Sequence, residues 1–401
     1  MFLQIHFLTS YHASLLNRDD AGLAKRVVFG GVPRLRVSSQ CQKRHWREWM
    51  TSRTDLPAGT RSRLVFDRIL RAELEQEGMA PDLATALVTR LADEVMQVSD
   101  KRTKGGNGAL DKDAVVRGVL GLSQAVLLGR PEVDYLKRIV KEAAKAGDTD
   151  AGLRYISETV SKDKKNVAAM RKQTGLDRAG AGFEGAMFGR FATSDLLARV
   201  DAPVHVAHAF TTHRLETEVD FFTVVDDLVS DDETGTAHLN DVELGAGIFY
   251  GYVAVDIPLL VSNLTGCHAA LWRKENPDAS RALLSLLIRA AAEVSPGAKL
   301  GATAPHARAE CVLLEVGTEQ PRSLANAFLE PVRMGGHTST NPMAESVAAM
   351  GRYAQDLDRM YGSEVERFVA SLHTWPDRVG TCGSFADTSK AALDAILGAS
   401  R

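Results

Sequence analysis

The run FLQIHFL at residues 2–8 alternates between apolar residues at positions 3, 5 and 7 and polar residues at positions 4 and 6. This period of two predicts a half-buried β-strand. A second strand-like run, AECVLLEV, occupies residues 309–316 near the other end of the chain. The fold therefore depends on which elements lie between these two runs.

Four further runs between them read as strands: GRFATSDLLARV (189–200), PVHVAHAF (203–210), EVDFFTVV (218–225) and GAGIFYGYVAVDI (245–257). Helices are expected just after residue 38 and over ASRALLSLLIRAAAEV (279–294). With the insertion set aside, the order is β-α-β-β-α-β, an α+β pattern of the ferredoxin-like or RRM type, whose open sheet face commonly serves RNA. After residue 320 we expect mostly helix, with Gly-rich breaks and no assigned role.

A helical insertion interrupts this pattern. Apolar residues recur at helical spacing in four runs, 63–76, 82–98, 114–128 and 133–146, and residues 101–113 form a flexible connector. We therefore expect a sheet domain made of residues 1–58 and 186–401, interrupted by a helical domain at residues 59–185.

Composition limits the class of protein. The 401 residues are 45% hydrophobic and 25% charged, which is typical of a globular chain. The four cysteines are isolated and give no zinc signature. There is no signal-peptide pattern, and the most apolar stretch, 247–261, falls short of the roughly 20 residues of a spanning helix. We expect a soluble cytoplasmic protein with no membrane partner, metal or cofactor.

The net charge of −3 conceals a segregation of charge along the chain. Residues 34–53 carry six Lys or Arg against a single acid, whereas residues 216–243 carry ten acids and no Lys or Arg. Such separation lets one face attract an anion while another meets a basic neighbour. Ordinary solvated surfaces explain the same pattern equally well.

The basic segment offers the best local site for RNA. Ser39 and Gln42 have the spacing of a capping box, which predicts a helix start, and a helix N-terminus favours phosphate. Lys43 and Arg47 are four residues apart and share one face of this helix. A surface helix with solubilising charge would have the same spacing.

Two further groups of residues suggest metal chemistry, and neither is convincing. On a strand, His205 and His208 would face opposite sides, so with His213 they are read as structural histidines. The acids around Asp226 and Asp227 fit Mg²⁺ in a nuclease, but an exposed acidic loop accounts for them as well. No nucleotide-binding, hydrolase or metalloprotease motif is present.

Several ordered segments resemble the CasC family, the backbone subunit of the type I-E CRISPR Cascade complex. The resemblance runs through residues 5–20, 27–47 and 189–228, with the motifs LNRDD, FGG, SSQ, GRFATS, HAFTTH and DFFTVVDDL. Shorter segments of similar sequence follow at GTAHLN, GIFYGYV, VSPGAK and SLANAF. The helical insertion and the C-terminal part carry little of it.

This resemblance implies an RRM-like palm, helical fingers and a protruding thumb at about 205–243. It implies that copies stack head to tail along CRISPR RNA, together with other Cascade subunits, and display bases for pairing with target DNA. Carried over residue by residue, it assigns contacts with the RNA to the following palm, GRFATS and thumb positions: Arg18, Ser38, Gln40, Lys43, Arg44, Phe191, Thr211 and Thr212.

The resemblance implies a non-catalytic protein, and two alternatives stand beside it. One is a metal-dependent ribonuclease of a related CRISPR effector, with Asp226 or Asp227 as the thumb aspartate. The other is a general binder of single-stranded RNA. Lys162, Lys164 and Lys165, near the end of the fingers, are expected to touch target DNA, although a solvated surface explains them equally well.

Overall fold

The computed structural model divides the chain into two compact units, and each is described by itself. The first unit contains Met1–Thr54, His205–Ile257 and Arg281–Arg401, and the second contains Asp55–Val204 and Pro258–Ser280. The structure describes residues 1–96, 120–176, 179–190, 197, 199–224, 238–334, 341–362, 365–377 and 379–398.

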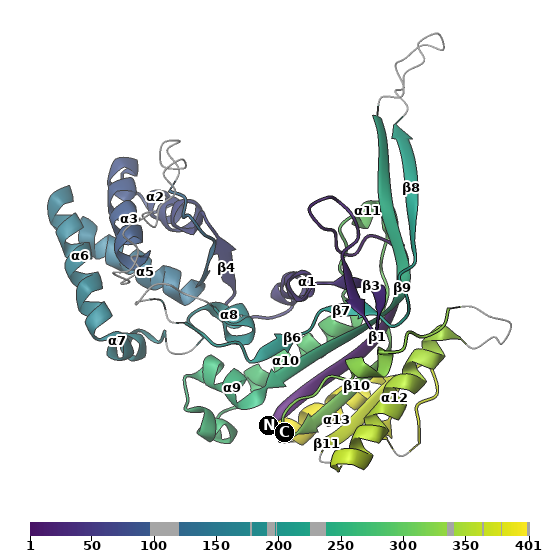
Figure 1. The fold of residues 1–401 in the computed structure, drawn as a ribbon. Helices are drawn as coiled ribbons and strands as arrows, with labels where there is room; N and C mark the ends of the chain where they lie inside the picture. Colours follow the sequence, from purple (N-terminus) through teal and green to yellow (C-terminus); the bar gives the residue numbers. More distant parts are fainter. Residues whose placement is uncertain are drawn as a thin grey trace, which may run out of the picture. The chain divides into compact units, whose positions relative to one another are not determined.

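A ten-stranded sheet forms the centre of the first unit (Figure 1). Its main path runs β12-β11-β10-β1-β9-β7-β3-β2, and both β6 and β8 also pair with β9. The strands are β1 (Phe2–Ser14), β2 (Arg26–Phe29), β3 (Val32–Val37), β6 (Val204–Val206), β7 (Ala209–Thr211), β8 (Thr217–Val224), β9 (His238–Asp256), β10 (Ala309–Gly317), β11 (Val365–Ser371) and β12 (Thr381–Cys382). The helical elements of this unit are α1 (Ser39–Thr51), α10 (Asp278–Glu293), α11 (Leu300–Thr303), η3 (Ala325–Phe328), α12 (Pro342–Tyr361) and α13 (Phe385–Leu397).

The predicted α+β order is confirmed at the centre of this sheet. Along the chain, β1, α1, β7, β9, α10 and β10 follow one another, and the four strands lie in the order β10-β1-β9-β7 with every neighbour antiparallel. Ile5 of β1 is opposite Val253 of β9 on one side and Leu314 of β10 on the other. This is the split β-α-β arrangement of ferredoxin-like folds.

The expectation that β1 is half-buried is wrong, because both faces of the sheet are covered. Leu3 and Ile5 have no exposed surface, and neither has His6 on the opposite face. The second face packs against α12, whose Val347 and Met350 belong to the same core cluster as Leu8 of β1. The C-terminal part therefore covers the sheet face that an RRM leaves open, and it also contributes the strands β11 and β12, which the sequence reading missed.

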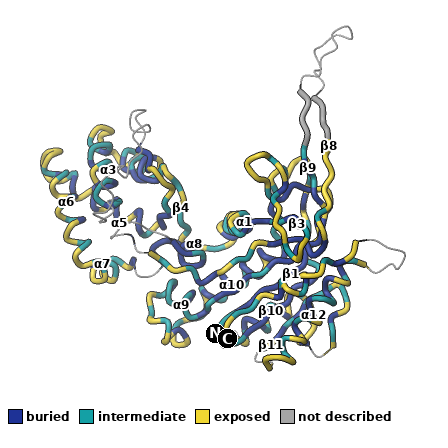
Figure 2. The backbone as a smooth tube through the Cα atoms, in the orientation of Figure 1, coloured by how far each residue is buried: buried dark blue, intermediate teal, exposed yellow. Residues whose placement is uncertain are grey.

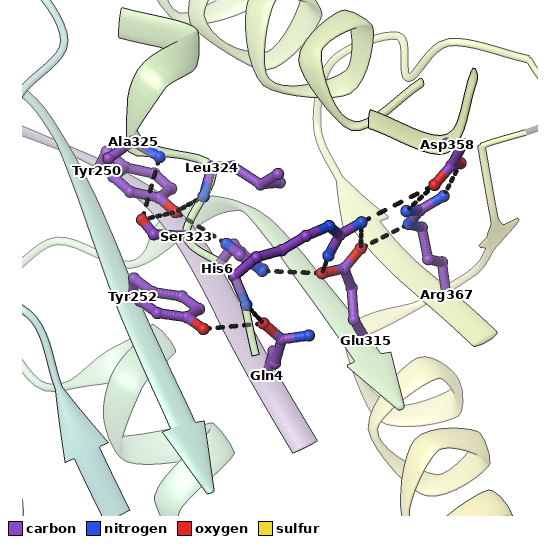
Figure 3. Close-up of polar contacts among 11 residues, drawn as sticks. Gln4, His6, Tyr250, Tyr252, Glu315, Ser323, Leu324, Ala325, Asp358 and Arg367 are labelled. Atoms are coloured by element: carbon purple, nitrogen blue, oxygen red, sulfur yellow. Dashed lines mark hydrogen bonds and ion pairs between the residues drawn. The ribbon is translucent and has the colours of Figure 1, made fainter. Parts of the chain in front are cut away.

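Polar side chains on this second face form a buried network (Figure 3). The carboxylate of Glu315 on β10 has no exposed surface and lies 3.2 Å from Nε2 of His6, 2.7 Å from Arg322 and 2.6 Å from Arg367. Arg367 continues the network to Asp358 at the end of α12. These polar side chains can be buried because each charge is paired and hydrogen-bonded within the network.

The thumb prediction corresponds to a two-stranded arm. β8 pairs with the first part of β9 from Thr217↔Gly245 to Val224↔His238, whereas β1 pairs with β9 only from Gly245 onward. The arm therefore continues past the end of β1, and the described side chains at 216–220 of this arm are exposed (Figures 1 and 2).

The second unit is mainly helical. Its core is formed by apolar side chains of α3, α5 and α6, among them Leu91, Ile139 and Ile156. Its elements are η1 (Phe66–Arg71, a π-helix), α2 (Ala72–Gln76), α3 (Pro81–Met96), α5 (Arg130–Ala144), α6 (Thr149–Lys165), α7 (Val167–Thr174), α8 (Gly182–Phe188), α9 (Ile257–Thr265), η2 (Ala269–Lys274) and the strand pair β4 (Gly59–Ser62) and β5 (Val126–Gly129). The strand β5 replaces the end of the helix expected over 114–128.

The two units divide the chain differently from the expected boundaries. Residues 186–204 and 258–280 group with the helices rather than with the sheet. Arg190 forms a buried ion pair with Glu132 of α5, with nitrogen–oxygen distances of 2.5 and 2.8 Å. Asn263 donates hydrogen bonds to the carbonyls of Ala186 and Asp201, both at 3.0 Å. These contacts hold the two segments in the helical unit.

Candidate nucleic-acid interface

The first turn of α1 is built around Ser38. This residue caps the helix, because its ψ of 148° is extended and its hydroxyl accepts a hydrogen bond from the amide of Cys41 at 3.3 Å. The predicted capping box of Ser39 and Gln42 is therefore wrong by one residue. Gln42 instead donates to the carbonyl of Ala207 at 2.9 Å and joins α1 to the segment before β7.

A loop that precedes β2 is tied to this helix start. The amide of Ser38 donates to Oδ1 of Asn17 at 2.9 Å, and the amide of Lys25 donates to the carbonyl of Asn17 at the same distance. The amide of Arg36 donates in turn to the carbonyl of Lys25 at 2.8 Å. Three segments distant in sequence are thus held together, and exposed Arg18 lies in the same loop.

The basic side chains around this helix start influence one another electrostatically. Burial and then the neighbouring Arg47 lower the pKa of Lys43. Burial, followed by Arg36 and then Lys25, lowers the pKa of His208, whose Nδ1 lies 2.8 Å from the guanidinium of Arg36. A bound anion would offset this mutual repulsion and desolvation. A capped helix of 13 residues adds free N–H groups and the positive end of its dipole.

The structure brings five of the predicted palm positions together here. Arg18, Gln40 and Arg44 are exposed, Lys43 is half-buried, and Ser38 is buried as the cap. Arg44 also pairs with Glu48 at 2.9 Å, and both side chains of this pair are well exposed. We define the basic site at the start of α1 as the basic side chains of this helix and of the segments tied to its start: Arg18, Lys25, Arg36, Lys43, Arg44, Arg47 and His208.

The two predicted thumb threonines lie elsewhere, at the end of β7 and just after it. Neither Thr211 nor Thr212 has exposed surface. Thr211 receives a hydrogen bond from the amide of Leu35 at 3.2 Å, and the hydroxyl of Thr212 bonds that of Ser346 on α12 at 3.0 Å. These side chains fix β7 within the sheet and present nothing for RNA to touch directly.

The remaining predicted residues are separate from this site. Phe191, Asp226 and Asp227 lie outside the described residues. Lys162, Lys164 and Lys165 form the basic last turn of α6 in the helical unit. Lys162 and Lys165 are exposed there, whereas Lys164 donates to the carbonyl of Glu94 at 2.5 Å and helps to close the end of α3.

Sequence reasoning missed Lys25 and His208 as members of the site. No spacing rule could have found them, because the pairing Arg36↔Phe210 between β3 and β7 is what brings His208 to Arg36. His213 is structural, as expected: its Nδ1 lies 2.7 Å from the carbonyl of Arg214, and its Nε2 accepts from the amide of Ile248 at 3.2 Å.

The part of the chain that is described has neither a metal site nor a membrane span. No group of three or more His, Cys, Asp or Glu there has a metal-binding arrangement. Among the same residues, no helix is both long enough and apolar enough to cross a membrane.

Comparisons with known proteins agree with this fold. Two chains of solved structures are similar over 98% of this chain and 100% of their own length. One is from the "CRISPR RNA-guided surveillance complex, pre-nicking", with 26% identity and a TM-score of 0.77. Another, from a "CRISPR RNA-guided surveillance complex", has 22% identity and a TM-score of 0.70, and supports the fold alone.

Among curated proteins, none matches this chain. A family model described as CT1975-like protein matches residues 3–394, which includes both units and nearly the whole sequence. This chain belongs to the CT1975-like protein family.

Proposed function

We propose that this chain is a subunit of a CRISPR RNA-guided surveillance complex and, within that class, the repeated backbone subunit of a type I-E Cascade. The family match and the likeness to a chain of one such complex, at 26% identity, support the broader assignment. The motifs SSQ and HAFTTH, together with the LNRDD segment, favour the narrower one.

The observation that carries the proposal is the basic site at the start of α1. Its basic side chains come from α1 and from the segments tied to its capped N-terminus, a combination that suits the phosphates of RNA. Contacts of this kind hold a guide of any sequence, because base pairing supplies the specificity in RNA-guided complexes. Lys43 favours such an occupant, since burial beside Arg47 lowers its pKa and a phosphate would restore it.

Further parts of the proposal concern the partners. Copies of the chain stack head to tail along the CRISPR RNA, together with other Cascade subunits, and leave the bases free to pair with target DNA. Exposed Lys162 and Lys165 add a non-specific attraction for that DNA. Lys164 contributes less, since it already bonds the carbonyl of Glu94.

The chain holds RNA and does not cut it. The rival ribonuclease would depend on a thumb aspartate and a divalent metal ion. Incubation with a guide paired to complementary RNA in the presence of Mg²⁺ tests this part directly. Intact RNA with the wild-type chain agrees with the proposal, and cleavage that disappears in Asp226→Ala or Asp227→Ala would establish the rival.

The phosphate contacts are tested by the salt dependence of RNA binding. A Lys25→Ala/Lys43→Ala variant should bind a single-stranded RNA more weakly for every sequence tried. Each lost phosphate contact lowers the slope of log K against log salt by roughly 0.7, so the double variant should lose about 1.4.

A charge-matched control is Arg352→Ala/Arg359→Ala on α12, whose side chains are 59% and 73% exposed. Its slope should equal that of the wild type. Equal slopes for all three proteins would mean that the start of α1 does not hold RNA.

A further inference from the structure

A second basic surface lies at the end of α1 and on α10, away from the site at the start of α1. The guanidinium of Arg53 lies 4.3 Å from the centre of the Trp49 ring, and the guanidinium of Arg289, on α10, lies 5.6 Å from the same centre. Trp49 is half-buried and both arginines are exposed. We name Trp49, Arg53 and Arg289 the tryptophan clamp.

Helix geometry separates this clamp from the flank of α1 that carries Lys43 and Arg47. Lys43 and Arg47 share a face, and Trp49 lies two residues beyond Arg47, which turns it roughly 200° around the helix. The buried side chains of Trp46 and Met50 lie between the two flanks and face the sheet. One RNA phosphate cannot contact both groups of cations.

The arginines of the clamp are ordered before any partner arrives. Arg53 donates hydrogen bonds to the carbonyl of Trp49 at 3.1 Å and to the hydroxyl of Ser52 at 2.7 Å. Arg289 is held 3.2 Å from the carboxylate of Glu293. Side chains that are already fixed lose less entropy on binding, and Trp and Arg are the residues most enriched at energetic centres of protein interfaces.

The spacing of the two charges indicates the kind of partner. From their distances to the shared ring, the two guanidinium carbons lie no more than about 10 Å apart. Two carboxylates at positions i and i+2 of a strand lie on one face about 7 Å apart. An acidic β-strand therefore fits the clamp.

The chain itself carries such a strand. Glu218 and Asp220 are two residues apart on β8, both are exposed, and Glu216 precedes them at the same interval. β8 pairs only with β9, so its other edge has no strand beside it among the described residues. We propose that the acidic face of β8 in one copy docks on the tryptophan clamp of a second copy. This inference rests on the proposed head-to-tail stacking and names the residues that would carry it.

A reciprocal charge exchange tests the contact in the full-length protein. One variant, Arg53→Glu/Arg289→Glu, reverses the clamp, and the other, Glu218→Arg/Asp220→Arg, reverses the strand. Each alone should associate roughly 10- to 100-fold more weakly than the wild type in sedimentation with a long single-stranded RNA, because like charges then face each other. An equimolar mixture of the two should recover assembly, because every contact in an alternating array is again between opposite charges.

The Arg352→Glu/Arg359→Glu variant on α12 controls for the loss of positive charge and should assemble as the wild type does. Binding to an RNA too short for two subunits is measured separately and should be the same for all variants. Wild-type assembly by the clamp variant, or a mixture no better than its components, would overturn the proposed contact. Loss of short-RNA binding in the clamp variant would identify RNA as the occupant and would overturn it equally. Failure of the wild type itself to bind RNA would instead refute the proposed function.

Discussion

Replacing Glu315 with Gln should destabilise the sheet unit strongly. The carboxylate has no exposed surface and is the shared acceptor for His6, Arg322 and Arg367. The amide has the same shape but removes the charge and turns a donor toward the arginines. Arg367, with only 4% of its side chain exposed, would then have Asp358 as its remaining ion-pair partner in the network described here. Removing one partner from a buried ion pair costs about 3–5 kcal/mol, and the remaining pair with Asp358 favours the lower end of that range.

The matched control is Glu310→Gln on the same strand. Glu310 also pairs with a histidine, His373, at 2.9 Å, but its side chain is 31% exposed. A partly exposed pair of this kind contributes about 1 kcal/mol or less. Urea unfolding followed by circular dichroism measures both variants. If the free energy of unfolding fell by the same small amount in both variants, the buried network would not stabilise the sheet unit by the amount predicted here.

The same network predicts how stability depends on pH. Burial raises the pKa of Glu315, but the hydrogen bond and charge of His6, with Arg322, outweigh it and hold the pKa well below the ordinary 4.5. Its contribution is therefore complete above pH 4.5 and is lost as the pH falls below that value. Burial lowers the pKa of His6 against the opposing effect of Glu315, so folding also weakens below pH 6.5, where the unfolded chain takes up a proton. The difference in stability between the wild type and Glu315→Gln should shrink as the pH falls below 4.5, because the unfolded wild type takes up a proton there that the glutamine variant has no carboxylate to bind.

Two pairs of smaller substitutions test local geometry. Ser38→Ala should lower the free energy of unfolding in urea by about 1 kcal/mol, because it removes the cap of α1. Ser39→Ala should lower it by a few tenths of a kcal/mol at most. The reverse order would mean that Ser39 caps the helix, as the capping-box spacing predicted. Gly30→Ala should be clearly more destabilising than Gly31→Ala. Both glycines have a positive φ, of 62° and 77°. A Cβ at Gly30 would lie 1.8 Å from the carbonyl oxygen of Leu329, whereas a Cβ at Gly31 would meet open space. Equal losses at the two glycines would mean that the turn does not pack on Leu329 as described.

The order of the four central strands with α1 and α10 could be predicted from sequence, because the apolar periodicity of β1, β9 and β10 is local, whereas β11 and β12 were missed. The second face of the sheet could not. Gln4 and His6 look like solvent-facing residues of a half-buried strand, and only the partners that they meet, Tyr252 at 2.8 Å and Glu315 at 3.2 Å, make their burial tolerable. Those partners come from segments distant in sequence, so a local pattern cannot predict them.

The candidate site was predictable in part for the same reason. Lys43 and Arg44 could be found because they lie on one short helix beside a cap. Lys25 and His208 join them only through hydrogen bonds and strand pairing between segments far apart in sequence. Thr211 and Thr212 show the opposite case. Their sequence motif is distinctive, yet both side chains are buried within the sheet unit, where Thr212 bonds Ser346.

The most direct test of the account is electron microscopy of the purified chain with and without a long single-stranded RNA. The account predicts isolated particles without RNA and helical filaments with it, and the filaments should be lost in the Lys25→Ala/Lys43→Ala variant. Isolated particles under both conditions would contradict the proposal that this chain assembles head to tail along RNA.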